Sequence, residues 1–325
     1  MVQKKALILG ITGQDGSHLA EILLDKGYEV HGLIRRSATG NKKNIAHIQD
    51  KIALHKGDLA DATSLYRVIN SVRPAEIYNM ADQDHVSWSY DAVDYSIDIT
   101  GAAVARILEI IKQVDAKIRF LQPVSFNMFG KVPSPQNEES SFRPQSLYGC
   151  AKVLAYVLAR YYRDVYGLFA STAIFGNHES PRRSEEYVTK KIVRAAARIS
   201  KGLQKEIYLG DLSMKIDFGY SKEYAEAAWN ILQLKKPDDF MICTGEVHSV
   251  KEWLDESFNF VGLNADDYVK IDSKLIRPSK TDVLTGDPVK ARKAFGFRPK
   301  IKFKEIVKIM MECELKEVEK ELKCR

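Results

Sequence analysis

The sequence predicts an α/β fold: a doubly wound parallel sheet, followed by a smaller mixed α/β C-terminal lobe. Three observations predict it. The chain has 325 residues, 45% of them hydrophobic, which is enough to bury a large core. Its first 130 residues alternate short apolar runs with amphipathic stretches, the pattern of βαβ units. A glycine-rich segment directly follows the first apolar run. We expect residues 1–170 to form mainly the sheet domain and residues 171–325 mainly the second lobe, with segments that interleave.

The elements follow from the spacing of apolar residues and from turn-forming residues. Strands are expected at 6–10, 29–34, 52–55, 76–79, 119–124 and 171–175. Helices are expected at 17–26, 64–72, 98–113, 147–166 and 303–322. A proline-containing polar stretch over 130–144 predicts a loop, and residues 200–286 predict only short mixed elements.

Composition excludes several classes of protein. The net charge of +6 comes from basic residues that are spread thinly, which argues against a nucleic-acid partner. No apolar run reaches the roughly 18 residues that a membrane span needs, so we expect no membrane association. The cysteines at 150, 243, 313 and 324 show no C-x-x-C spacing and no zinc pattern, which indicates no metal site and a cytoplasmic protein.

The glycine-rich segment Gly10-Ile11-Thr12-Gly13-Gln14-Asp15-Gly16 lies between a predicted strand and a predicted helix. Glycines allow a tight turn and close approach of the backbone to a pyrophosphate, which then faces the N-terminus of the helix. Glycine triplets also occur in ordinary turns. The placement between strand and helix favours a Rossmann-type dinucleotide site.

The end of the second strand normally distinguishes the two nicotinamide dinucleotides, because a carboxylate there binds the ribose 2′-hydroxyl and cations bind a 2′-phosphate. This chain has Arg35 and Arg36 and no acid. NADP(H) is therefore favoured and NAD(H) is the alternative. Both arginines are also compatible with a plain surface position. Asp58 fits an adenine contact or a cap on the next helix.

A second group of residues has the chemistry of proton transfer. Tyr148 and Lys152 lie four apart on a predicted helix, so they share a face. An ammonium beside a phenol lowers the phenol's pKa and lets it act as a general base on a hydroxyl. Ser125, at the end of the strand over 119–124, supplies a further hydroxyl. Tyr187 and Lys191 have the same spacing, so the spacing alone does not identify the pair.

These residues resemble the extended short-chain dehydrogenase/reductases and, among them, the GDP-mannose 4,6-dehydratase family. The resemblance covers nearly the whole chain. Besides residues 10–16 it rests on Val30-His-Gly-Leu-Ile-Arg-Arg-Ser37, Gly57-Asp-Leu59, Ile77-Tyr-Asn79, Asn177-His-Glu-Ser-Pro-Arg-Arg183, Thr244-Gly-Glu-Val-His-Ser249, and Arg277-Pro278 followed by Gly286-Asp-Pro288.

The resemblance implies an NAD(P)-dependent enzyme of nucleotide-sugar metabolism, acting on a GDP-linked sugar for polysaccharide biosynthesis, as a homodimer or homotetramer. It implies cofactor contacts from Gly10, Ile11, Thr12, Gly13, Gln14, Asp15, Gly16, Arg35, Arg36, Ser37, Ala38, Asp58, Leu59, Met80, Ala81, Asp82, Gln83, Asp84, Tyr95, Tyr148, Lys152, His178 and Arg183. It implies substrate contacts from Ser125, Asn177, Lys191 and Arg277. The plain structural alternatives are a loop cap for Asn177, a hydrogen-bonded buried histidine for His178 and a solvated Lys191.

The chain departs from the family's pattern near the catalytic strand. The family has Thr-Ser-Glu where this chain has Ser125-Phe126-Asn127, and its glutamate removes the C5 proton during loss of water. An amide is not a base near neutral pH. Ile216 replaces an arginine assigned to the diphosphate region, and Asp82 and Asp84 add negative charge beside the cofactor positions.

Three functions remain open at this stage. The first is an oxidoreductase acting at C4 of a GDP-hexose or GDP-heptose, as a 4-dehydrogenase, 4-epimerase or 4-keto reductase. In it, Asn127 occupies the position where the family has its glutamate base. The second is a 4,6-dehydratase with a base elsewhere, for which Glu138, Glu139 and His178 are candidates. The third is a non-catalytic dinucleotide-binding sensor.

Overall fold

A computed structural model of the chain describes residues 3–37, 40–275 and 283–324. Its larger part is a seven-stranded parallel sheet in the order β11-β6-β5-β4-β1-β2-β3. The strands are β1 (Lys5–Leu9), β2 (Glu29–Ile34), β3 (Ala53–Lys56), β4 (Glu76–Asn79), β5 (Arg119–Ser125), β6 (Ala170–Phe175) and β11 (Asp239–Ile242). This confirms the predicted doubly wound α/β fold.

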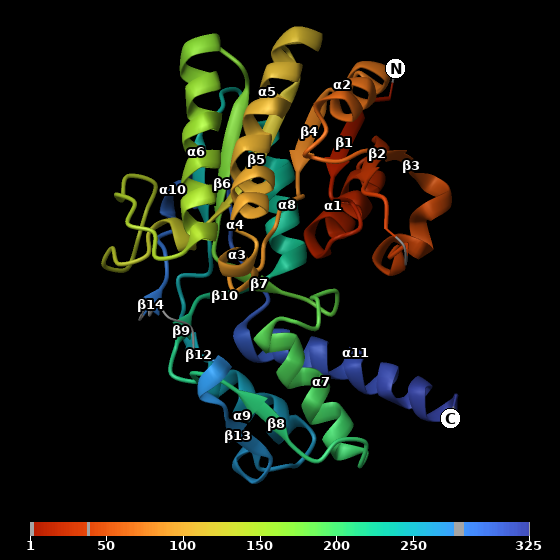
Figure 1. The fold of residues 1–325 in the computed structure, drawn as a ribbon, viewed down its shortest axis with the longest axis vertical. Helices are drawn as coiled ribbons and strands as arrows, with labels where there is room; N and C mark the ends of the chain where they lie inside the picture. The colour runs from red at the N-terminus through yellow and green to blue at the C-terminus, as the bar shows by residue number, and fades with distance from the viewer. Residues whose placement is uncertain (1–2, 38–39, 276–282, 325) are drawn as a thin grey trace.

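Helices cover both faces of this sheet (Figure 1). One face carries α1 (Gln14–Asp25) and α8 (Ser221–Gln233), which pack against each other, with α10 (Val289–Phe295) beside β11. The other carries α2 (Ala62–Val72), α5 (Ala103–Val114) and α6 (Leu147–Tyr166). Strands buried on both faces are apolar along their length, which is why β1 reads as a continuous apolar run rather than an alternating one.

The helix expected over 98–113 begins as a wider turn. Ile97–Ala102 (η2) is a π-helical segment that continues into α5 and packs against α6. Gly101 permits this packing, because a Cβ there would lie 2.9 Å from the Leu154 side chain. The short helices α3 (Trp88–Asp91) and α4 (Val93–Ser96) precede it, and η1 (Lys43–Lys51) lies before β3.

A smaller lobe lies below the carboxyl ends of the strands (Figure 1). Its core is formed by α7 (Val188–Ser200), α9 (Val250–Phe260) and α11 (Phe303–Lys323). Its strands are short: β7 (Asn177–Glu179), β8 (Ile207–Leu209), β9 (Lys215–Ile216), β10 (Phe218–Tyr220), β12 (His248–Ser249), β13 (Val269–Ile271) and β14 (Val283–Leu284). Further single turns are η3 (Phe126–Met128), η4 (Ala265–Asp267) and η5 (Ser273–Leu275).

The chain passes repeatedly between the two parts. After β6 it enters the smaller lobe, and it then returns to the sheet for α8 and β11. The four cysteines all lie in the described part of the chain and are free thiols. Among the described helices, none is both long and apolar enough to cross a membrane.

Candidate active site

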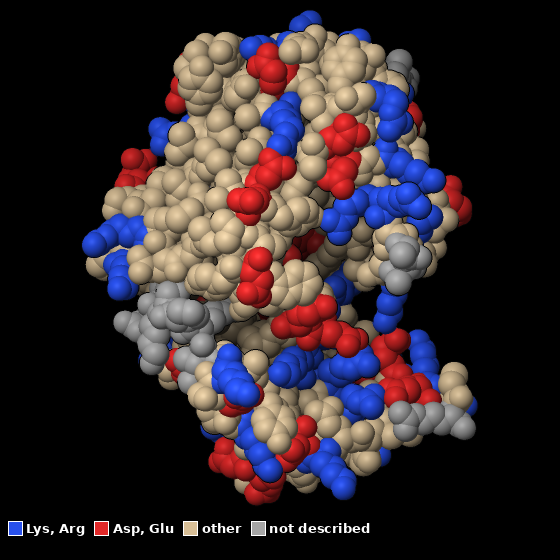
Figure 2. All heavy atoms as spheres, viewed as in Figure 1, with Lys and Arg blue, Asp and Glu red and all other residues tan. Residues whose placement is uncertain are grey.

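A cavity of about 1020 Å³ lies at the carboxyl ends of β1, β4, β5 and β6, between the sheet and the smaller lobe. Figure 2 shows the hollow between the two parts, with Lys and Arg side chains gathered on the side of β2 and β3. In open parallel sheets, ligands bind at this edge. The predicted site residues on the cavity wall are Gly10, Thr12, Gly13, Gln14, Asp15, Arg35, Met80, Ala81, Asp82, Asp84, Ser125, Asn127, Tyr148, Lys152, Asn177, His178, Arg183 and Lys191.

The glycine-rich turn is held against the sheet by close backbone contacts. Gly10 has φ +79°, and a Cβ on it would lie 2.6 Å from the Met80 carbonyl oxygen. A Cβ on Gly16 would lie 2.3 Å from the Gly10 carbonyl oxygen. Both positions therefore require glycine. The turn delivers the chain to the N-terminus of α1, where no side chain caps the helix, so its backbone N–H groups suit a pyrophosphate.

Helix α6 brings the predicted proton-transfer pair into the cavity. Ser146 caps it by accepting a hydrogen bond from the Gly149 N–H, so the helix starts just before Tyr148. Tyr148 and Lys152 are both buried and one turn apart, with the Lys152 Nζ 5.6 Å from the centroid of the Tyr148 ring. The Lys152 Nζ also donates a hydrogen bond of 3.1 Å to the Pro123 carbonyl oxygen. This contact directs the ammonium toward the end of β5.

Ser125 and Asn127 complete this part of the site. Ser125 is the last residue of β5, and the Asn127 side-chain amide donates a hydrogen bond of 3.1 Å to its hydroxyl oxygen. An amide nitrogen that donates in this way has no free lone pair for proton abstraction. Asn127 therefore orients the Ser125 hydroxyl, which also interacts with the Tyr148 hydroxyl and opposes the rise in the pKa of Tyr148 that burial causes.

Two carboxylates shape the electrostatics of the pair. The Asp82 Oδ2 lies 2.5 Å from the Lys152 Nζ. Burial alone lowers the pKa of Lys152, but Asp82 and Tyr148 outweigh it and the pKa is raised. Burial also raises the pKa of Tyr148; Lys152 opposes that shift, while Asp82 and Asp84 add to it. The tyrosine is accordingly a weaker acid than in a site where the lysine charge acts alone.

His178 ties the glycine-rich turn to the smaller lobe. Its Nε2 lies 2.9 Å from the Asp15 Oδ2, and its Nδ1 lies 2.8 Å from the Gly176 carbonyl oxygen. Ser221 also donates to the Asp15 carboxylate. Burial lowers the pKa of His178, but Asp15 raises it above its ordinary value. Both ring nitrogens face oxygen atoms of the chain, so hydrogen bonds hold the imidazole in place, and a role for His178 as a base stays a prediction.

The two glutamates among the candidate bases lie away from the site. The Glu138 Oε1 accepts a hydrogen bond of 2.7 Å from the Met241 N–H, and Glu139 is exposed; neither lines the cavity. Asp58 does not cap the following helix: α2 is capped by Asp61, which accepts from the Thr63 N–H. Asp61 caps the helix rather than Asp58, because a capping residue must immediately precede the first turn of the helix.

Some predicted cofactor residues lie outside the cavity wall. They are Ile11, Gly16, Arg36, Ser37, Asp58, Leu59, Gln83 and Tyr95. Arg35 itself lines the cavity, and its guanidinium donates to the Tyr95 hydroxyl. Ala38 and Arg277 lie outside the described residues.

The substrate side of the cavity contains residues that the sequence did not single out. Lys191 was predicted, and its Nζ donates a hydrogen bond of 2.7 Å to the Tyr208 carbonyl oxygen. Tyr187, which has the same spacing to Lys191 as Tyr148 has to Lys152, also lines the wall, with the Arg183 guanidinium 3.6 Å from its ring centroid. The four-residue spacing of Tyr187 and Lys191 was the one sequence signal that could have pointed to Tyr187 as a wall residue. The remaining unpredicted wall residues include His85, Val86, Ser87, Trp88, Gln145, Phe175, Glu186, Leu209, Gly210, Asp211, Ser213 and Met214.

Comparison with known proteins agrees with this geometry. A family model described as GDP-mannose 4,6 dehydratase matches residues 7–310. GDP-mannose 4,6 dehydratase 2 of Arabidopsis thaliana is 45% identical over 331 residues, covering 98% of this chain and 89% of that protein. The human GDP-mannose 4,6 dehydratase is 42% identical, covering 95% and 91%. The UDP-glucose 4-epimerase of Thermus thermophilus, solved in complex with NAD, has a TM-score of 0.83 at 25% identity, covering 95% of this chain and 98% of that one. With identities above 40% sustained over nearly the full length of both partners, this chain belongs to the GDP-mannose 4,6-dehydratase family.

Proposed function

We propose that the protein is a 4,6-dehydratase of a GDP-linked sugar, GDP-mannose or a GDP-heptose. The observation that carries the proposal is the family match over residues 7–310, together with Ser125, Tyr148 and Lys152 on one cavity wall. In this proposal residues 171–325 form mainly the nucleotide-sugar lobe, and the GDP group lies toward Asn177 and Lys191. The relatives named above support GDP-mannose as the first substrate to try.

The cofactor in this proposal is NADP(H), with NAD(H) as the alternative. The turn over 10–16 fits a dinucleotide, because its glycines let it pack closely against the chain after β4 and it leads to the uncapped N-terminus of α1, whose N–H groups suit a pyrophosphate. Arg35 on the cavity wall suits a 2′-phosphate. A nicotinamide cofactor bound there would supply the hydride acceptor for oxidation at C4. Mass spectrometry of the nucleotide released from purified protein identifies the cofactor directly.

The residues of the chain account for the proton transfer at C4. Tyr148 takes the proton of the C4 hydroxyl, Lys152 stabilises the tyrosinate, and Ser125 donates a hydrogen bond to the same oxygen. Oxidation at C4 makes the C5 proton acidic. Its removal, with loss of the C6 hydroxyl as water, requires a further acid/base group, and Asn127 does not provide one.

A second candidate function is favoured by Asn127. Without a base for C5, the reaction ends at C4, as in a 4-dehydrogenase, a 4-epimerase or a 4-keto reductase. The Asn127–Ser125 hydrogen bond fits this reading as well as the first. A non-catalytic sensor is the remaining alternative, and any hydride transfer to a nucleotide sugar would exclude it.

One experiment separates dehydration from C4 oxidation. The protein is incubated with GDP-mannose and, separately, with a GDP-heptose, and the sugar is analysed by mass spectrometry. A product lighter by one water supports the dehydratase; a product lighter by two hydrogens, with no water loss, refutes it and supports C4 oxidation. In the second case Asn127→Glu should introduce elimination, and Asn127→Gln is the matched control without a carboxylate.

We also propose a homodimer or homotetramer. Leu154, Val157, Tyr161 and Val165 form an exposed apolar stripe along α6, at spacings that share one helix face. Light scattering coupled to size exclusion measures the mass. Val157→Asp should shift the protein toward the monomer, and an unchanged mass would remove this stripe from the interface.

A further inference from the structure

The cavity contains carboxylates where the resemblance leads one to expect uncharged residues. Asp82 and Asp84 follow β4, whereas the lost carboxylate, at Asn127, follows β5. These strands are neighbours in the sheet, with Tyr78 paired to Leu121. Because parallel strands end at the same edge, the loop after β4 lies beside the position of the missing base. All three side chains line the same cavity.

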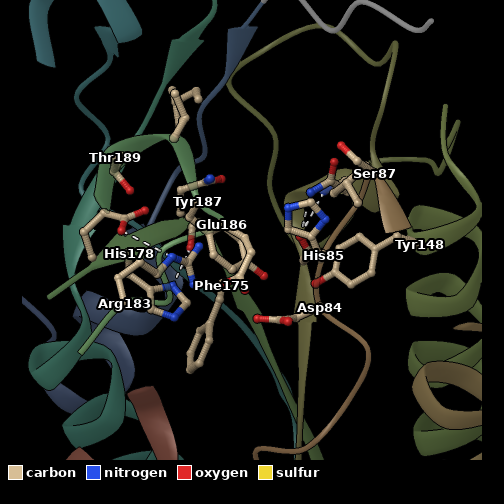
Figure 3. A pocket seen from close by; sticks show the side chains of 18 of the residues that line it. Asp84, His85, Ser87, Tyr148, Phe175, His178, Arg183, Glu186, Tyr187 and Thr189 are labelled. Atoms are coloured by element: carbon tan, nitrogen blue, oxygen red, sulfur yellow. Dashed lines mark hydrogen bonds and ion pairs between the residues drawn. The ribbon is translucent and has the colours of Figure 1, made fainter. Parts of the chain in front are cut away.

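The two aspartates have different surroundings. The Asp82 carboxylate forms an ion pair with Lys152, its Oδ2 lying 2.5 Å from the ammonium nitrogen. The charge of Asp84 acts on groups from both sides of the cavity: it adds to the raised pKa of Tyr148 on α6 and of Tyr187, both of which are raised chiefly by burial. Figure 3 shows Asp84 in the space between Tyr148 on one side and Phe175 and Tyr187 on the other. Its carboxylate lines the cavity, where it interacts with the Tyr187 hydroxyl.

Proximity to Tyr148 matters because of the chemistry proposed above. C4 and C5 of a hexose are bonded to each other, so the group that acts on the C5 proton must lie within a few ångströms of the group that acts on the C4 hydroxyl. Tyr148 is that second group. Among the other carboxylates that line the described cavity, Glu179 pairs with Arg183 and Asp15 pairs with His178. Glu186 accepts a hydrogen bond from the Ser184 hydroxyl, and Asp211 accepts one from the Ser213 hydroxyl. Asp84 combines a place beside Tyr148 with a side chain that faces the cavity.

We propose that Asp84 is the acid/base of the elimination step, in place of the carboxylate absent at Asn127. This inference rests on the proposed dehydratase function. The C5–H bond breaks and its proton passes to the Asp84 carboxylate. The C5 electron pair forms the C5–C6 double bond as the C6–O bond breaks, and the Asp84 proton leaves with the hydroxyl as water. The hydride taken from C4 is returned to C6, and C5 takes a proton from solvent, so C4 is oxidised and C6 reduced with net loss of one water.

The test follows the two half-reactions separately in D₂O with GDP-mannose. Reduction of the bound cofactor in a single turnover reports C4 oxidation, while mass spectrometry reports water loss and deuterium at C5. For Asp84→Asn we expect C4 oxidation within about tenfold of the unmodified protein, water loss reduced at least about a hundredfold, and deuterium at C5 reduced equally. Asp84→Glu should retain part of the elimination. The double variant Asp84→Asn, Asn127→Glu should regain it.

Each outcome decides the matter. If Asp84→Asn shifts the pH profile of oxidation but still eliminates water, Asp84 only tunes Tyr148 and the inference is overturned. If the unmodified protein oxidises C4 without losing water, the proposed dehydratase function fails first and the role of Asp84 falls with it. If Asp84→Asn does not fold, Asp84→Ser is measured in the same way, with thermal denaturation as the check, and retained elimination again overturns the inference.

Discussion

Replacing Asp82 by asparagine tests how the site sets the basicity of its tyrosine. The substitution keeps the size of the side chain and removes its charge beside Lys152. The full lysine charge then acts on Tyr148, so the pKa of Tyr148 should fall. C4 oxidation requires the ionised tyrosine, and a lower pKa places more of it in that form at a given pH. The acidic limb of the kcat/KM profile should therefore move to lower pH.

The size of the effect follows from the geometry. The Lys152 Nζ lies 5.6 Å from the centroid of the Tyr148 ring. With an effective dielectric constant of about 20, opposite charges at that distance attract by about 3 kcal/mol, which corresponds to about two pKa units. Asp82 cancels a large share of this attraction, since its Oδ2 is 2.5 Å from the same ammonium. We expect the limb to move by about one to two pH units.

The assay is the pH dependence of kcat/KM for conversion of GDP-mannose, followed by mass spectrometry of the sugar, for the unmodified protein and for Asp82→Asn. Asp94→Asn removes one carboxylate from an exposed position and controls for net charge. A profile for Asp82→Asn that stays in place, or moves to higher pH, would refute the electrostatic argument. A uniform loss of rate at every pH would point to a purely structural role for Asp82.

Three further predictions concern single groups. Lys152→Met should lower the single-turnover rate of C4 oxidation by about a hundredfold or more, as measured by cofactor absorbance, because no ammonium remains to stabilise the tyrosinate. Asp239→Asn should lower the free energy of unfolding in urea by about 3–5 kcal/mol, because it leaves the partly buried Arg163, now bonded to Asp239 at 2.8 and 2.9 Å, without its counter-charge. The pKa of His178 is raised in the folded protein by Asp15, so its contribution to stability is fully present below the ordinary histidine pKa of about 6.5 and is lost as pH rises through the raised value. Melting temperatures measured across that range should fall with pH, and His178→Gln should flatten the slope.

The sheet and the cofactor side of the site were predictable because their signals are local. The glycine turn over 10–16, the apolar strands and the one-turn spacing of Tyr148 and Lys152 each depend on residues close in sequence. Their meeting in one cavity follows from parallel strands, whose carboxyl ends share an edge.

The substrate side was not predictable in the same way. Strands of two residues, such as β9 and β12, are too short to show an alternating pattern, so their pairing depends on tertiary packing. The Asp82–Lys152 pair joins a loop to a helix 70 residues away and has no sequence signal of its own. The two contacts of the His178 ring, one with a residue of α1 and one with a residue before β7, likewise become visible only in the fold.

The repeated passage of the chain between the sheet and the smaller lobe restricts how the two can move and evolve. A single linker would act as a hinge, and either part could be expressed alone or exchanged as a cassette. Here the chain enters the smaller lobe after β6, returns for α8 and β11, and then enters the smaller lobe again, so several separate connections join the two parts. A truncation after residue 170 would remove two strands and leave β5 as an unprotected sheet edge. Substitutions that alter which sugar is accepted should therefore fall in the loops between these connecting segments, while the distance between the sheet and the smaller lobe stays constant.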